Sequence, residues 1–167
     1  MKKILVIEDE TDLRANVSRF LKAEGYEVLA AANGAAGVET AFAQMPDLTV
    51  SAGVVSGREA FGMAGISPAD VDVLEPYDSF TITVLLALED LGFCAKGEGG
   101  AFVQDGRLGP GGTLPALTSG GGLSYNHPGA LGLLLLVEAV RQLRGEAGER
   151  QVPDARIGVA HGVGGMM

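Results

Sequence analysis

The sequence contains no tryptophan, a single cysteine and few basic residues, and each shortage excludes a class of protein. One thiol, Cys94, excludes an internal disulfide and any zinc cluster built from cysteines, and it is typical of a reducing, cytoplasmic setting. The net charge is −9, from 12 Lys and Arg against 21 Asp and Glu. Because phosphate and anionic lipid surfaces are bound by clustered basic side chains, we expect neither nucleic acid nor a membrane as partner.

Long hydrophobic runs are also missing. The longest late run, residues 131–137, is too short to cross a bilayer. Hydrophobic residues nevertheless make up 47% of the 167 positions, enough for a packed core. The length suits one domain, or one domain with an appendage.

The first 48 residues alternate short apolar runs with helical periodicity. Residues 3–7 predict a buried strand that ends in acidic residues, and apolar positions between 13 and 21 predict a helix that stops at Gly25. Residues 26–31 predict a second strand, and residues 35–45 a second helix. The order strand–helix–strand–helix is typical of the start of a doubly wound parallel sheet.

The pattern changes after Asp47. The later segments predict, in chain order, a helix at 51–64, a strand at 71–74, an apolar helix at 80–91, a glycine-rich loop region at 97–122, a helix at 130–143 and a strand at 157–160. In the first of these helices we expect Val54, Ala60, Phe61 and Ala64 to face inward. The 130–143 helix is apolar almost all round, which is typical of the middle of a layered structure.

The N-terminal segment resembles the receiver domain of response regulators. The resemblance rests on Lys3 to Glu10, on Gly25 to Val28 and on Ala32 to Gly34. In that family two acidic residues after the first strand bind Mg²⁺, and Glu8 and Asp9 occupy those positions here. The phosphoacceptor aspartate would fall at Ala52, which offers no nucleophile. Because that third carboxylate is missing, we favour a solvated charged loop over a working Mg²⁺ site.

Residues 49–167 resemble the lipid-transfer, retro-aldolase-like branch of the thiolase superfamily. The resemblance rests on several separate segments: 58–72, 77–81, 92–102, 119–129, 142–145 and 161–162. Together they imply an α/β chain: a partial thiolase-like layered half at 49–167, preceded by the receiver-like strand–helix–strand–helix segment at 1–48.

The resemblance implies a role for two histidines and no role for the cysteine. His127 occupies the position of an active-site histidine that helps activate a nucleophile or holds an enolate oxygen. His161-Gly162 stands where thiolases carry a second catalytic cysteine, and the first such cysteine lies in the N-terminal half of their fold. The resemblance therefore does not support Claisen condensation by the two-cysteine route. We expect Cys94 to be packed rather than reactive.

Cysteine-free members of this branch resemble retro-aldolases that cleave β-hydroxyacyl-CoA with tyrosines as acid–base groups. Tyr77 and Tyr125 stand at the matching positions. A tyrosine acting as base needs its pKa of about 10 lowered by cations or donors. The alternative is that both tyrosines only pack. Asp78 either positions a water or a ring, or caps the 80–91 helix.

Three hypotheses follow for the whole chain. The first is a thiolase-like enzyme on acyl-CoA, a carbon–carbon lyase or an acyl transferase of lipid metabolism, with no tightly bound cofactor. The second is a receiver-like signalling or interaction module that is not phosphorylated. The third is a fusion or truncated product, and we expect the isolated chain to be inactive. Because about one thiolase half is encoded, we expect a homo-oligomer, or a partner that supplies the missing half.

Overall fold

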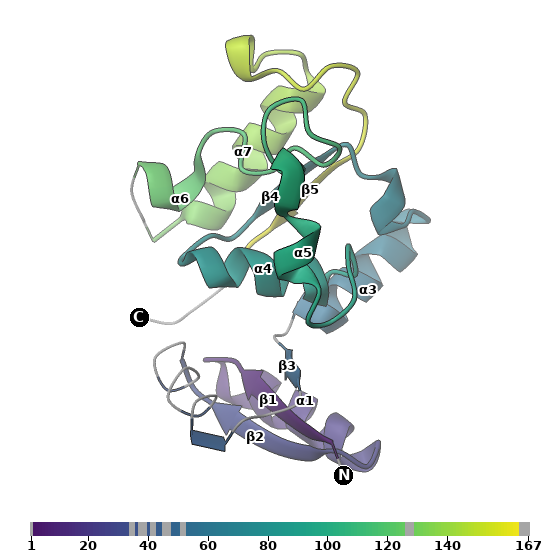
Figure 1. Ribbon diagram of the computed structural model, residues 1–167, viewed down its shortest axis with the longest axis vertical. Helices are drawn as coiled ribbons and strands as arrows, with labels where there is room; N and C mark the ends of the chain where they lie inside the picture. Colours follow the sequence, from purple (N-terminus) through teal and green to yellow (C-terminus); the bar gives the residue numbers. More distant parts are fainter. Residues whose placement is uncertain are drawn as a thin grey trace.

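The structure is a computed structural model that describes residues 2–33, 48–50, 53–125 and 129–163, with positions 36, 40, 43 and 44. It is a mixed α/β protein, as the sequence predicts, with two small parallel sheets. Figure 1 shows the N-terminal sheet at the bottom of the view and the larger body above it. In the part of the chain that the structure describes, no helix has both the length and the apolar character to span a membrane.

The N-terminal sheet consists of β1 (Lys3–Ile7), β2 (Glu27–Ala31) and β3 (Leu48–Val50) in the order β2-β1-β3, all parallel. Helix α1 (Thr11–Ala23) connects β1 to β2, and Glu10 caps it by accepting from the amides of Asp12 and Leu13. This confirms the predicted strand–helix–strand order. Most of the predicted 35–45 helix lies outside the described residues, and so does Ala52. Strand β3 spans the predicted junction at 48/49 and pairs with β1.

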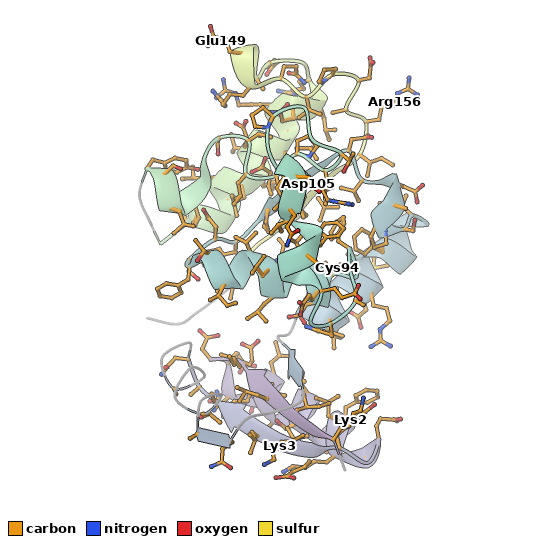
Figure 2. The ribbon with its side chains drawn as sticks, viewed as in Figure 1. Lys2, Lys3, Cys94, Asp105, Glu149 and Arg156 are labelled. Carbon is orange, nitrogen blue, oxygen red and sulfur yellow. The ribbon has the colours of Figure 1, made fainter. Side chains whose placement is uncertain are left out.

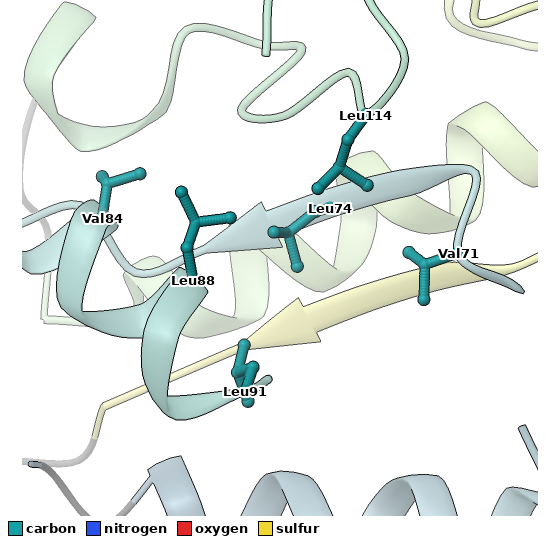
Figure 3. Close-up of a cluster of buried hydrophobic side chains, with 6 residues drawn as sticks. All are labelled: Val71, Leu74, Val84, Leu88, Leu91 and Leu114. Carbon is teal, nitrogen blue, oxygen red and sulfur yellow. The ribbon is translucent and has the colours of Figure 1, made fainter. Parts of the chain in front are cut away.

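The second sheet pairs β4 (Val73–Pro76) with β5 (Gly158–His161) in parallel, and helices cover both of its faces. Helix α7 (Leu131–Leu143) packs on one face. On the other face Leu74 belongs to a buried cluster with Val84 and Leu88 of α4 (Thr81–Asp90) and Leu91 at its C-cap. Val71 and Leu114 are the other members of this cluster (Figure 3). Successive side chains of β4 therefore point to opposite faces of the sheet, as in any strand. Leu74 points toward α4 and Glu75 toward α7.

Helix α3 (Gly53–Ala64) corrects the predicted inward face. Val54 and Phe61 are half-buried as expected, but Ala60 and Ala64 are exposed. Gly53 and Gly57 are buried instead. A Cβ at Gly57 would lie 2.7 Å from Leu91 Cδ2, so the absence of a side chain allows the close approach of α3 to the end of α4. The prediction placed hydrophobic residues on the inward face, but glycines form the contact between α3 and α4.

Strand β4 extends two residues beyond the predicted 71–74 segment and includes Glu75 and Pro76. The turn η1 (Pro68–Asp70) precedes β4 and is closed by a capping box between Ser67 and Asp70. The glycine-rich region contains three short helical turns: α5 (Gly99–Phe102), η2 (Gln104–Gly106) and α6 (Gly121–Ser124). A last turn, η3 (Gly148–Arg150), precedes β5.

Candidate functional site

The carboxyl ends of β4 and β5 lie at one edge of the second sheet. Pro76 pairs with His161 in the ladder, so Tyr77, the next residue after β4, emerges beside the end of β5. Ligands of open α/β sheets commonly bind at the carboxyl ends of parallel strands. Register alone therefore brings the adjacent residues Tyr77 and Asp78 to the same edge as His161, which lies more than 80 positions later in the sequence.

Asp78 is fully buried and holds α6 against this edge. Its Oδ1 accepts from the amide of Gly122 at 2.9 Å, and its Oδ2 accepts from the amide of Leu123 at 3.0 Å. A Cβ at Gly121, which has φ +62°, would collide with Oδ2, so this approach requires glycine. Of the two alternatives given for Asp78, the one in which it caps the 80–91 helix is wrong. Phe80 and Thr83 close the start of α4, and Asp78 closes α6 instead.

Tyr125 directly follows α6, two residues after an amide that Asp78 binds. The residue is 47% exposed, and its hydroxyl lies 3.3 Å from Ser119 Oγ. Asp78 thus positions the turn that carries Tyr125. His127 follows two residues later and, with Asn126 and Pro128, lies outside the described residues.

The surroundings of Tyr77 shift its pKa in the direction opposite to the one that a general base needs. Burial, followed by the negative charges of Asp78 and Asp9, raises the pKa of its phenol. A raised pKa keeps the hydroxyl protonated at neutral pH, so in this environment Tyr77 is suited to donate a hydrogen bond.

His161 is half-buried at the end of β5. Burial lowers the pKa of its imidazole, against the smaller opposing effect of Asp90, so the ring is neutral at pH 7. Its Nδ1 has no hydrogen-bond partner among the described residues. A buried ring nitrogen without a partner costs free energy, which is typical of positions kept for a ligand or for catalysis.

The remaining predicted residues lie elsewhere. Cys94 falls between α4 and α5, half-buried against the core (Figure 2), and burial raises the pKa of its thiol, as expected for a packed cysteine. Glu8 is buried after β1, and desolvation raises the pKa of its carboxyl. Both Glu8 and Asp9 accept from the amide of Glu10. The described residues contain no group of three or more His, Cys, Asp or Glu side chains that could hold a metal ion.

An open hollow of about 440 Å³ lies on another part of the molecule, lined by Ser67, Pro68, Ala69, Val71, Gly92, Phe93, Phe102, Arg107, Thr113 and Leu114. The predicted site residues are not among those that line it. The Arg107 guanidinium is stacked on the Phe102 ring, 4.4 Å from its centroid. This hollow is therefore separate from the edge that carries Tyr77 and His161.

Comparison with known proteins identifies the family to which this arrangement belongs. The family described as thiolase C-terminal domain-like matches residues 34–167. The chain belongs to that family. The match starts before residue 49, so residues 34–48 fall both within it and within the predicted receiver-like segment, whose resemblance stays a prediction.

Relatives of the thiolase C-terminal domain-like chain include enzymes of more than one kind. An acetyl-CoA acetyltransferase of Methanothermobacter thermautotrophicus is 48% identical over 121 residues, covering 71% of this chain and 32% of that protein. A 17-hydroxy-3-oxo-4-pregnene-20-carboxyl-CoA lyase of Mycobacterium tuberculosis is 46% identical over 91 residues, covering 53% of this chain and 22% of that protein. The chain thus spans a third or less of these relatives.

A solved structure, an Ltp2-ChsH2(DUF35) aldolase, is similar in fold as well as in sequence. The TM-score is 0.56 at 40% identity, covering 62% of this chain and 26% of that chain. The predicted α/β class with a thiolase-like half is therefore confirmed.

Sequence reasoning missed one feature beside this site: the buried carboxylates Glu75 and Glu138. The signal was present, since each is an isolated acid within an apolar segment. Such an acid is expensive to bury unless it is paired or protonated.

Proposed function

We propose that residues 49–167 form the C-terminal part of a thiolase-like carbon–carbon lyase that acts on a β-hydroxyacyl-CoA. The observation that carries this is the sheet edge where Tyr77 and His161 emerge and where Asp78 anchors the turn of Tyr125. The names of the relatives support an acyl-CoA thioester and an aldol-type cleavage. Acyl transfer is the alternative chemistry, which the acetyltransferase relative supports.

The roles in the cleavage follow from the protonation states. A base removes the β-hydroxyl proton, the carbon–carbon bond breaks, and hydrogen-bond donors stabilise the thioester enolate that forms. We assign the donor role to Tyr77, because its raised pKa keeps its proton in place. We assign proton transfer to the exposed Tyr125 and, from the resemblance of its segment, to His127. The neutral His161 orients the substrate from the end of β5.

The first test is the release of an aldehyde or ketone from a β-hydroxyacyl-CoA. The chain should be assayed alone and co-produced with the N-terminal half of the mycobacterial lyase relative. We expect release only in the co-produced form. Tyr125→Phe removes the hydroxyl and keeps the ring, and we expect it to lower kcat on the order of 10²-fold or more, as loss of an acid–base group does. Tyr26→Phe, in the N-terminal segment, is the matched control. No release by the co-produced wild type would reject the lyase function.

Helix α7 supports the proposal that a partner completes the chain. Its inner face is buried, but its outer face is a row of exposed apolar side chains: Leu133 at 61%, Leu134 at 39%, Leu136 at 49%, Val137 at 47%, Val140 at 40% and Leu143 at 42%. Burying a fully exposed Leu or Val side chain contributes roughly 1.5–3 kcal/mol, so covering each of these partly exposed side chains contributes roughly half of that. We propose that a second copy of the chain, or an N-terminal thiolase half on another chain, covers this face.

We therefore expect the isolated chain to self-associate through α7. Leu133→Lys with Leu136→Lys should shift the species seen by light scattering toward monomer, because charges on this face oppose its burial. The control is Ala60→Lys with Met63→Lys, which puts the same charges on the exposed side of α3, where Met63 is 90% exposed. A wild type that stays a monodisperse monomer at high concentration would contradict the expectation.

A receiver-like interaction module stays the alternative for the N-terminal segment. The observation that favours it is the parallel strand order β2-β1-β3, which is also the start of the flavodoxin-like order 2-1-3-4-5.

A further inference from the structure

A buried row of polar groups lies behind the proposed site, between β4 and α7. Glu75 is fully buried and Glu138 is 4% exposed. The Thr118 hydroxyl lies between them, with its Oγ1 at 2.7 Å from Glu75 Oε1 and 2.9 Å from Glu138 Oε1. The Thr118 amide also donates to Glu75 Oε1 at 3.0 Å. Two carboxyl groups that are far apart in the sequence thus meet on one hydroxyl.

The hydrogen bonds of this row require that one of the two carboxyl groups is protonated. Thr118 has one hydroxyl proton, and its Oγ1 already accepts from Gln142 Nε2 at 2.9 Å. It can donate to only one of the two carboxyl oxygens. The other short oxygen–oxygen contact is favourable only if that carboxyl group itself carries a proton and donates it to Thr118.

The surroundings decide which carboxyl group is protonated. Glu138 Oε2 accepts from Arg150 Nη2 at 3.2 Å, and Gln142 Nε2 donates to its Oε1 at 3.2 Å. Burial acts to raise the pKa of Glu138, but the hydrogen bonds from Arg150, Thr118 and Gln142 outweigh it and lower the pKa. Glu138 is therefore the ionised partner.

Glu75 is placed to keep the proton. Its Oε2 is buried with no hydrogen-bond partner among the described residues. Two negatively charged groups face Glu75: Glu138 on α7, and Asp78, which follows β4. The nearby cation Arg150 donates its hydrogen bonds to Glu138. From β5, its ladder partner is Ala160, which precedes the neutral His161. Burial above all, with the charges of Glu138 and Asp78, raises the pKa of Glu75 to about 7.

The row continues to the proposed site through the residue after Thr118. Ser119 Oγ lies 3.3 Å from the Tyr125 hydroxyl, so the position of the Thr118 backbone sets where Ser119 meets the phenol. We propose that Glu75 and Glu138 share one proton through the Thr118 hydroxyl, and that this pair positions Ser119 against Tyr125. Glu75, Thr118 and Glu138 are then positioning residues of the proposed lyase site. Their part in catalysis rests on the proposed function.

Ionisation of Glu75 breaks this arrangement. The proton passes from Glu75 to solvent, which leaves two carboxylates on one hydroxyl proton. The repulsion moves Thr118, and Ser119 with it, away from Tyr125. The arrangement is therefore intact at mildly acidic pH and is lost as the pH rises through about 7.

The test is a pH titration of the full chain by NMR, with carbon-13 at the glutamate side-chain carboxyls and at the tyrosine rings. We expect one glutamate carboxyl to titrate near neutrality and to be absent in Glu75→Gln. The Tyr125 ring signal should shift over the same pH range in the wild type. Thr118→Val removes the bridging hydroxyl and should uncouple the ring from that titration, while Thr118→Ser keeps the hydroxyl and should preserve the coupling.

Two outcomes would overturn the inference. In one, every glutamate titrates near its ordinary value. In the other, the valine and serine variants give the same Tyr125 titration, which would leave Thr118 with a packing role only. Because no substrate is present, these outcomes are distinct from those of the cleavage assay. If the NMR titration shows the shared proton but the co-produced chain cleaves no substrate, the lyase function is rejected and the shared proton stands.

Discussion

Replacing Asp78 with alanine is expected to lower the free energy of unfolding by about 2–4 kcal/mol. The carboxylate accepts from two backbone amides of α6 while fully buried, and a hydrogen bond to a charged group contributes roughly 1.5–3 kcal/mol. Alanine leaves both amides without their acceptor in a buried corner. Urea unfolding followed by circular dichroism measures the change, because the chain has no tryptophan to report it.

Two further variants separate the loss of the hydrogen bonds from a general effect of charge. Asp78→Asn keeps one oxygen that can accept and should lose about half as much as alanine. Glu59→Ala removes a carboxylate from the exposed side of α3 and should change the free energy of unfolding by less than about 0.5 kcal/mol. Equal losses for Asp78→Ala and Glu59→Ala would show that Asp78 does not hold α6.

Glu75→Gln is expected to change how stability depends on pH. Glu75 has a pKa of 4.5 as the ordinary value and about 7 in the folded chain. Below pH 4.5 both states hold the proton. Between pH 4.5 and 7 the unfolded chain loses it while the folded chain keeps it, so this group makes stability fall as pH rises, and the fall ends above pH 7. At about 1.36 kcal/mol per pH unit, the contribution is roughly 3 kcal/mol.

Glutamine cannot ionise, and its amide can still reach Thr118. The stability of Glu75→Gln relative to the wild type should therefore increase from pH 4.5 to 7 and then stay constant. Urea unfolding at a series of pH values measures this difference, in which the other titrating groups cancel. Glu149→Gln, an exposed glutamate on η3, should show no such trend. Parallel pH profiles for the wild type and Glu75→Gln would mean that Glu75 is ionised in the folded chain at neutral pH.

Much of the fold could be predicted because it depends on local patterns. Strands β1 and β2 of the first sheet and the apolar helices α4 and α7 follow from runs and periodicities that a sequence displays directly. The inward face of α3 did not follow, because its contact depends on Gly57 and on the approach of Leu91 from α4. The end of β4 was also missed, since Glu75 and Pro76 do not look like residues of a buried strand.

The candidate site could also be predicted only in part. The resemblance of its segments to thiolases pointed to Tyr77, Tyr125, His161 and His127, but their roles stay proposals. The partner of Asp78 could not be predicted, because the amides of Gly122 and Leu123 are more than 40 positions away in the chain. The same holds for Glu75 and Glu138, whose meeting point is the Thr118 hydroxyl.

The sequence by itself determined the family, the α/β class and the residue types available for chemistry, because these depend on composition, short motifs and the spacing of apolar side chains. Only the tertiary structure decided which acid caps which helix and which acid has a raised pKa. Hydrogen bonds and desolvation are set by neighbours in space, and the parallel pairing of β4 with β5 brings those neighbours from opposite ends of the chain's second part.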